Sequence, residues 1–285
     1  MFRPQNFPAR WFYPLISGLV ALGLVVGTPQ LSSAFDLRDL IGPARDVIQL
    51  TSLSDEQEME LGGEINEQIA KEVKFYRDRS INEYVREIGE RLTPHSTRPN
   101  LDFKFQVVDD DAINAFATMG GYVYVNTGLL KAADNEAQVA GVIAHEIGHI
   151  TGKHAIKQIR RQIITQGLAN AAGLERNQLI QLGAEVVLRL PHSRRHEYDA
   201  DRRGLENFVA AGYAPIGMVQ FFQKLVRNGA SLPTILSTHP DTKDRIIALE
   251  EMIQQQYPGR EKVGYGLDAD AYAQKVKSLK YSNEQ

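Results

Sequence analysis

Apolar residues recur every third or fourth position along two stretches between residues 54 and 92, a spacing that predicts amphipathic helices. Each stretch opens with a capping-box pattern, Ser54 to Gln57 in the first and Ser80 to Glu83 in the second. The apolar positions that we expect to face a core are Leu61, Ile65, Ile69, Val73, Ile81, Val85, Ile88 and Leu92.

The pattern changes between residues 103 and 126, where β-branched and aromatic residues predict extended strands. Residues 103–108 form the first expected strand, and residues 112–118 form a second extended segment. Gly120 and Gly121 then supply a turn before residues 122–126, in which tyrosine and valine alternate. These segments predict a small antiparallel sheet directly before the next helix.

That next helix, for which Asp134 is the expected N-cap, has apolar residues on several sides and is therefore expected to be deeply buried. It contains the sequence His145-Glu146-Ile147-Gly148-His149. A glycine inside a helix costs about 1 kcal/mol relative to alanine. We expect Gly148 to offset this cost by allowing close approach to the neighbouring strand.

Downstream of the motif the chain is predominantly helical. Residues 154–190 are amphipathic, with breaks expected at Gly167 and Gly173, and predict a helical hairpin beside the motif. Charged residues interrupt each apolar run there, so no second membrane span is predicted. Further helices are expected over residues 193–211, from Pro215 onward, and over 241–256 and 269–279, with a loop over 231–240. The predicted fold class is α+β, mainly helical with one small sheet.

The N-terminus predicts export. Arg3 and Arg10 precede the apolar run of residues 11–26, and residues 32–34 are small enough for cleavage before Phe35. We expect residues 1–34 to be a cleaved signal peptide, with a retained membrane anchor as the alternative, residues 35–53 to be a lead-in segment and residues 54–285 to form one domain. The expected location is the periplasm or an equivalent lumenal compartment, with peripheral membrane association through the N-terminal segment left open.

Composition narrows the chemistry. The 285 residues carry a net charge of −3, so no basic face is implied and a nucleic-acid partner is not expected. The chain has no cysteine, which excludes disulfides, thiolate metal sites and cysteine nucleophiles. Any metal must therefore be held by histidines and carboxylates.

The histidine motif predicts such a metal. If residues 135–152 are helical, His145 and His149 lie four residues apart and project from nearly the same face, so both imidazoles can reach one ion. Glu146 then points beside the metal, where it can take a proton from water. This is the H-E-x-x-H pattern of zinc metalloproteases, and it predicts one zinc ion per chain.

A catalytic zinc usually takes a third protein ligand, and two residues compete for this role. His154 lies one residue short of the position that the extended H-E-x-x-H-x-x-G-x-x-H pattern requires. Glu197 lies on a later predicted helix, four residues before Asp201 and on the same face. In that arrangement Glu197 binds zinc, and Asp201 accepts the remaining N–H of a histidine ligand.

Several separated pieces of the sequence together resemble the gluzincin metallopeptidases that include the CAAX prenyl proteases, the HtpX-like proteases and their soluble periplasmic relatives. The pieces are Asn114-Ala115-Phe116-Ala117, Gly120 to Val125, His145 to His149, Glu197 to Asp201, Ser237 to Pro240 and Arg245-Ile246. No multiple membrane spans are present, so the soluble exported branch fits better than the membrane proteases. The resemblance implies a zincin-type domain with the sheet packed beside the active-site helix.

The resemblance also implies roles for individual residues. Glu146 would be the general base, and His239 would either stabilise the oxyanion or occupy the fourth metal position in a resting state. Arg245 would anchor the His239 loop or assist at the oxyanion. The strand from Tyr122 to Asn126, which contains Tyr124, would accept an extended substrate as an added strand, or else be an ordinary core edge strand.

Asn114 would hold substrate backbone or serve as a turn or cap. His95, His192 and His196 are expected to face solvent, without a function.

Two functions follow from these features. The leading hypothesis is a zinc endopeptidase that acts on misfolded or misassembled proteins, with protein or peptide substrates as its partners. The alternative is a chaperone or assembly scaffold whose metal site is structural or silenced. Glu146 favours the enzyme because a glutamate at this position serves no purpose in metal binding itself. The sequence does not indicate an oligomeric state.

Overall fold

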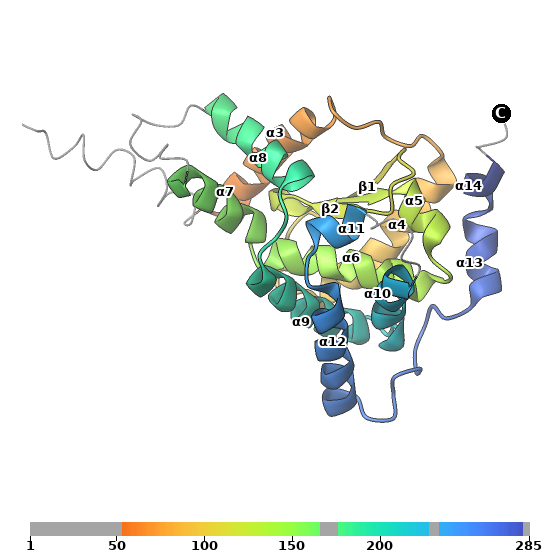
Figure 1. The fold of residues 1–285 in the computed structure, drawn as a ribbon. Coiled ribbons are helices and arrows are strands. Elements are labelled where there is room, and N and C mark those ends of the chain that lie inside the picture. The colour runs from red at the N-terminus through yellow and green to blue at the C-terminus, as the bar shows by residue number, and fades with distance from the viewer. Residues whose placement is uncertain (1–52, 166–175, 228–233, 282–285) are drawn as a thin grey trace, which may run out of the picture. The chain divides into compact units, whose positions relative to one another are not determined.

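A computed structural model describes residues 53–165, 176–227 and 234–281. Within these ranges helices pack on both faces of a three-stranded sheet (Figure 1), which confirms the α+β class. The strands are β1 (Lys104–Val108), β2 (Ala115–Ala117) and β3 (Tyr122–Asn126). The helices before α7 are α3 (Asp55–Ile69), α4 (Arg79–Leu92), η2 (Thr93–His95), η3 (Met119–Gly121), α5 (Thr127–Ala132) and α6 (Glu136–Thr151). Those that follow are α7 (His154–Thr165), α8 (Arg176–Arg189), α9 (Arg194–Ala210), α10 (Ile216–Arg227), α11 (Thr234–Thr238), α12 (Thr242–Gln256), α13 (Ala269–Lys275) and α14 (Lys277–Tyr281).

The sheet is mixed, with strand order β1-β3-β2. β2 pairs antiparallel with β3, as predicted, with Phe116 opposite Tyr124. β1 instead pairs parallel with β3, with Lys104 opposite Tyr122, so the fully antiparallel sheet was a wrong prediction. The hairpin through Gly120 and Gly121, both of which have positive φ, brings β3 back between the two earlier strands. β3 is therefore the central strand, and β2 lies at the edge nearest the motif helix.

Side chains on the sheet alternate between two cores, as the period of a strand requires. Val123 and Val125 face the larger core, which contains α4, α6, α10 and α12. Phe116 and Tyr124 stack at a ring-centroid distance of 4.5 Å in the smaller core, which contains α3, α7 and α8. The sheet therefore separates the motif helix α6 from α3 and α8.

The motif helix α6 is buried from Ala137 to Thr151. Its N-cap is Asn135, not the predicted Asp134, because the Asn135 side chain accepts a hydrogen bond from the Gln138 N–H. The close approach expected at Gly148 is to helix α9, not to a strand. A Cβ added there would lie 2.4 Å from the Ala200 carbonyl oxygen.

The start of helix α3 is as predicted, because the Ser54 capping box is confirmed. Two other boundaries differ from the sequence expectations. Helix α4 is capped by Asp78 and not by Ser80, because the Asp78 carboxylate accepts from the N–H groups of Ser80 and Ile81. The expected loop over 231–240 contains the short helix α11.

Some predictions fall outside the described residues. These are the N-terminal segments over residues 1–52 and the breaks at Gly167 and Gly173. Among the helices that the structure does describe, none combines the length and apolar content needed to cross a bilayer.

Candidate metal centre

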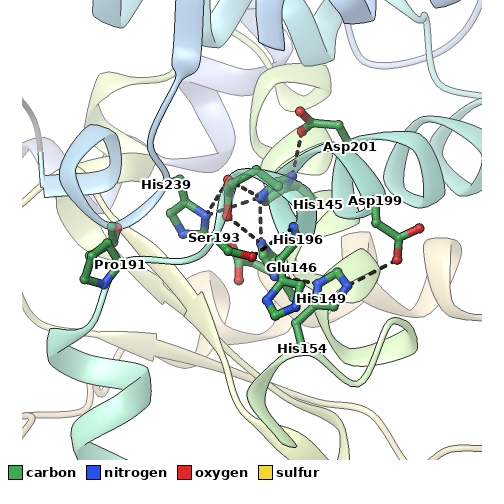
Figure 2. A network of polar contacts seen from close by, with 12 residues as sticks. His145, Glu146, His149, His154, Pro191, Ser193, His196, Asp199, Asp201 and His239 are labelled. Atoms are coloured by element: carbon green, nitrogen blue, oxygen red, sulfur yellow. Dashed lines mark hydrogen bonds and ion pairs between the residues drawn. The ribbon is translucent and has the colours of Figure 1, made fainter. Parts of the chain in front are cut away.

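Three separate parts of the chain bring nitrogen and oxygen ligand atoms to one buried point (Figure 2). His145 and His149 come from one face of α6, and Glu197 comes from the first turn of α9. His239 comes from the loop between α11 and α12. Each of these side chains is at most 3% exposed, and one ligand atom from each lies within 4.8 Å of the others. The prediction that Glu197 lies beside the two motif histidines therefore agrees with the geometry.

The spacing of these atoms suits a tetrahedral metal. His145 Nε2 lies 3.0 Å from His149 Nε2 and 3.5 Å from Glu197 Oε2, and His149 Nε2 lies 3.3 Å from Glu197 Oε1. His239 Nδ1 lies 3.2 Å from His145 Nε2 and 3.3 Å from Glu197 Oε2. Ligands at about 2.0–2.1 Å from a tetrahedral metal are roughly 3.3–3.4 Å apart. The printed separations lie near this value, and one ligand atom from each of the four residues lies within 4.8 Å of the others, so the four side chains can approach a single ion.

The outer contacts of the two motif histidines orient their lone pairs toward this point. His145 Nδ1 lies 2.8 Å from Asp201 Oδ1, so its proton is at Nδ1 and its Nε2 faces the cluster. Burial and the nearby His192 hold the pKa of His149 well below its ordinary value, so this ring is neutral. The two facing Nε2 atoms therefore need either a proton or a metal ion between their lone pairs.

His145 carries an extra proton when no metal is bound. Burial and the charge of Arg245 lower its pKa, but Asp201 and Glu197 outweigh them and raise the pKa to about 9. Burial also opposes ionisation of Glu197, yet His239 and Arg245 hold the pKa of this carboxyl well below its usual range. A metal at the site would therefore displace one proton from His145 and meet an ionised glutamate.

Arg245 links the carboxylates behind the site. Its Nε and Nη2 donate to the two Asp201 oxygens at 2.7 Å each, and its Nη1 forms an ion pair with Glu197. Nη1 also lies 3.4 Å from the His239 carbonyl oxygen, and the guanidinium lies 5.0 Å from the Phe222 ring centroid. The arrangement supports the anchoring alternative for Arg245, since the side chain is 1% exposed and lies behind the ligands. The sequence did not predict that Phe222 contacts this guanidinium.

Glu146 is fully buried beside the cluster. Neither carboxylate oxygen has a hydrogen-bond partner among the described residues, although His239 Nε2 lies 3.5 Å from Oε1. Burial raises the pKa of Glu146, and the charges of His239 and His145 oppose this rise. A buried carboxylate without partners is costly, and water held at a metal would satisfy it.

His154, the competing third ligand, occupies a different place. Its Nδ1 lies 3.0 Å from His149 Nδ1, on the side of that ring away from the cluster, and its Nε2 lies 3.1 Å from Asp199 Oδ2. Sequence reasoning did not find Asp199, because the helical register places Asp201, not Asp199, on the face of Glu197. Arg202 and Arg203 on the same helix form ion pairs with Asp199, while Glu197 and Asp201 are buried.

Two of the histidines expected to face solvent do not. The His192 ring packs on the His149 ring with 4.1 Å between centroids, and the backbone N–H of His192 donates to the backbone carbonyl oxygen of Thr238, next to His239. His196 is 8% exposed and stacks on His154. His95 is exposed, as predicted. His192 lies in the segment between α8 and α9, whereas His196 lies in the first turn of α9, and no local pattern in the sequence shows that either ring is turned inward.

The substrate-binding candidates fall on the sheet. Tyr124 is fully buried and its hydroxyl donates to Asn66, so it lies in the smaller core and not at the site. The strand that contains it is central and has no free edge, which corrects the prediction that it accepts a substrate. Asn114 lies just before β2; its carbonyl oxygen accepts from the Asn126 N–H, and its side chain lies 3.5 Å from the Thr238 hydroxyl.

Comparison with known proteins agrees with this arrangement. A profile of peptidase family M48 matches residues 79–253, more than half of the chain. The beta-barrel assembly-enhancing protease of Escherichia coli K12 is 28% identical over 261 residues, which are 86% of this chain and 53% of that protein. Two mitochondrial metalloendopeptidases named OMA1 also match. The Arabidopsis thaliana protein is 31% identical over 197 residues, which are 67% of this chain and 40% of that protein. The Schizosaccharomyces pombe protein is 30% identical over 184 residues, which are 62% of this chain and 55% of that protein.

This chain thus spans about half the length of these curated relatives. The matched region includes α4, the sheet, α6, α9 and most of α12, and therefore all four clustered ligand residues. The predicted resemblance to the gluzincin metallopeptidases is confirmed by the profile match and by the metallopeptidase relatives. The chain therefore belongs to peptidase family M48.

Proposed function

We propose that this protein is a zinc endopeptidase. The observation that carries the proposal is Glu146, a fully buried carboxylate with no hydrogen-bond partner among the described residues, placed beside four convergent metal-ligand atoms. His145, His149 and Glu197 would hold the zinc, a His2Glu set typical of catalytic sites. When bound, zinc lowers the pKa of water and polarises a peptide carbonyl.

Glu146 supplies the proton transfers. Burial raises its pKa, which brings this carboxyl closer to the working pH of a general base. It takes a proton from the attacking water and passes it to the leaving amine. His239 Nε2, 3.5 Å from Glu146 Oε1, is placed near the reacting groups.

His239 closes the ligand set in this conformation. Its Nδ1 is as near to His145 and Glu197 as those ligand atoms are to each other, which supports the fourth-ligand alternative over the oxyanion role. A site closed in this way holds no open position for water, so catalysis would require the loop between α11 and α12 to move. The position of His239 against His145 and Glu197 also favours the second candidate function, a chaperone or scaffold with a silenced metal site.

The edge of β2 is the proposed substrate platform. Phe116 pairs with the central strand, and Asn114 and Thr118 continue this pairing, so the N–H and C=O groups of Ala115 and Ala117 point to the other side. An extended peptide added there would be held by main-chain hydrogen bonds with little sequence preference. We propose misfolded or misassembled proteins of an exported compartment as substrates, which the printed name of the bacterial relatives supports.

The test compares Glu146→Gln with the wild type for casein cleavage and for bound zinc. The amide keeps the shape but cannot take a proton, so cleavage should fall about 10²–10⁴-fold while the zinc content stays at one per chain. Glu90→Gln, an exposed glutamate on α4, is the matched control and should change neither quantity. Equal cleavage by the wild type and Glu146→Gln, or no cleavage by either protein, would favour the scaffold.

A further inference from the structure

A chain of three side chains leads outward from the metal-ligand cluster on the side of His149 (Figure 2). His149 Nδ1 lies 3.0 Å from His154 Nδ1, and His154 Nε2 lies 3.1 Å from Asp199 Oδ2. Asp199 is itself fixed, because Arg203 Nε and Arg202 Nη2 each donate to it at 2.8 Å. The contact between His154 and Asp199 joins parts of the chain 45 residues apart, and the other contacts are local in sequence.

The proton positions along this chain follow from metal binding at His149. A metal at Nε2 needs the lone pair there, so the proton of His149 must be at Nδ1. His154 Nδ1 must then accept that proton, and the His154 proton is left at Nε2, where it can donate to Asp199. All three groups therefore make a hydrogen bond in one consistent tautomer set.

The charges agree with a neutral His154. Burial, the nearby His196 and the charge of Lys157 lower the pKa of His154 to about 3. Burial raises the pKa of Asp199, but the hydrogen bonds from Arg203 and Arg202 hold it below its usual range. A neutral imidazole between an ionised carboxylate and a metal ligand is what the tautomer set requires.

The backbone is shaped to hold the His154 ring in place. A Cβ added to Gly152 would lie 2.4 Å from His154 Nε2, so only glycine leaves room for the ring. Lys153 has a φ of 52°, a left-handed turn that starts α7 immediately after α6. On its other side the ring stacks on His196, with 4.4 Å between centroids and an interplanar angle of 3°. His154 is 1% exposed.

We propose that His154 and Asp199 are positioning residues for the ligand His149, which fix its tautomer and ring orientation and thereby set the metal affinity of the site. The two motif histidines then differ: His145 donates directly to the carboxylate of Asp201, whereas His149 donates to a neutral ring with the carboxylate one step further out. The inference rests on the part of the proposed function that makes His149 a metal ligand, and it does not depend on catalysis.

The experiment measures the zinc dissociation constant of the full chain by competition with a chromophoric chelator. His154→Leu keeps the buried volume but has no acceptor, and it should weaken zinc binding about 10–100-fold. His154→Asn places an amide oxygen near the position of Nδ1 and should restore most of the affinity. His95→Ala, an exposed histidine, is the control and should match the wild type.

Two further measurements separate positioning from stability. The urea midpoint of the metal-free protein should fall at least as much for His154→Asn as for His154→Leu, because the amide is the poorer core residue. Asp199→Asn keeps an acceptor and should weaken zinc binding less than Asp199→Ala. The visible spectrum of the cobalt-substituted protein should change in His154→Leu and be unchanged in His95→Ala.

A wild-type zinc affinity in His154→Leu would overturn the inference, as would equal losses in His154→Leu and His154→Asn. Both results leave the proposed function intact, because zinc would still bind and Glu146 would still be needed for cleavage. A wild-type protein that binds no zinc would instead overturn the proposed function and this inference together.

Discussion

Replacing Arg245 by methionine should destabilise the metal-free protein strongly. The methionine retains most of the apolar stem, so the change removes chiefly the charge. In the wild type that charge pairs with Asp201 through two contacts of 2.7 Å and with Glu197 through a third. All three side chains are at most 1% exposed, so solvent cannot replace the lost partner.

The magnitude follows from the carboxylates that are left behind. Removing one partner of a buried ion pair typically costs about 3–5 kcal/mol. Protonation of Asp201 limits the loss, because protonating a carboxyl of ordinary pKa about 3.9 costs about 4 kcal/mol at pH 7 and about 1.5 kcal/mol at pH 5. The difference in stability between the variant and the wild type should therefore shrink from about 4 to about 1.5 kcal/mol as the pH falls from 7 to 5.

Urea unfolding of the chelator-treated protein at both pH values measures these differences. Arg86→Met is the matched control. Arg86 forms an exposed ion pair with Glu90 one turn along α4, so this substitution should leave the stability nearly unchanged. A loss below about 1 kcal/mol for Arg245→Met at pH 7, or an equal loss at both pH values, would refute the reasoning.

Two further predictions concern the site itself. His239→Ala should retain zinc and raise casein cleavage, because the fourth ligand position is freed; a fall in cleavage with zinc retained would indicate the oxyanion role instead. Zinc affinity should increase about tenfold per pH unit between pH 7 and 9, because below its pKa of about 9 His145 holds a proton that zinc must displace. Chelator competition at pH 7 and 8 checks this slope, and a flat profile would contradict the assigned pKa.

The features that the sequence predicted well are local ones. The i, i+4 spacing of His145 and His149 determines their geometry once the helix forms, and the Ser54 capping box acts within one turn. Glu197 and Asp201 share a face for the same reason. Placing that face opposite the motif requires the crossing of α6 and α9, and at this step the resemblance to a known family was needed.

The features that the sequence did not reveal depend on long-range packing. The parallel pairing of β1 with β3 arises because a hairpin inserts β3 between two earlier strands, which strand patterns alone do not encode. His154 was considered only as a ligand, although the left-handed turn at Lys153 directs it to the outer side of His149. His192 has the polar neighbours of a surface residue, and its contact with the His149 ring depends on the fold of the segment between α8 and α9.

The central claim is that His145, His149 and Glu197 hold one zinc ion. Metal analysis of purified wild type and Glu197→Ala, each dialysed against the same zinc-buffered solution, tests this claim most directly. The account predicts one zinc per chain in the wild type and a sharp loss in Glu197→Ala, since removing one of three protein ligands leaves an incomplete site. Equal zinc content in the two proteins would contradict it.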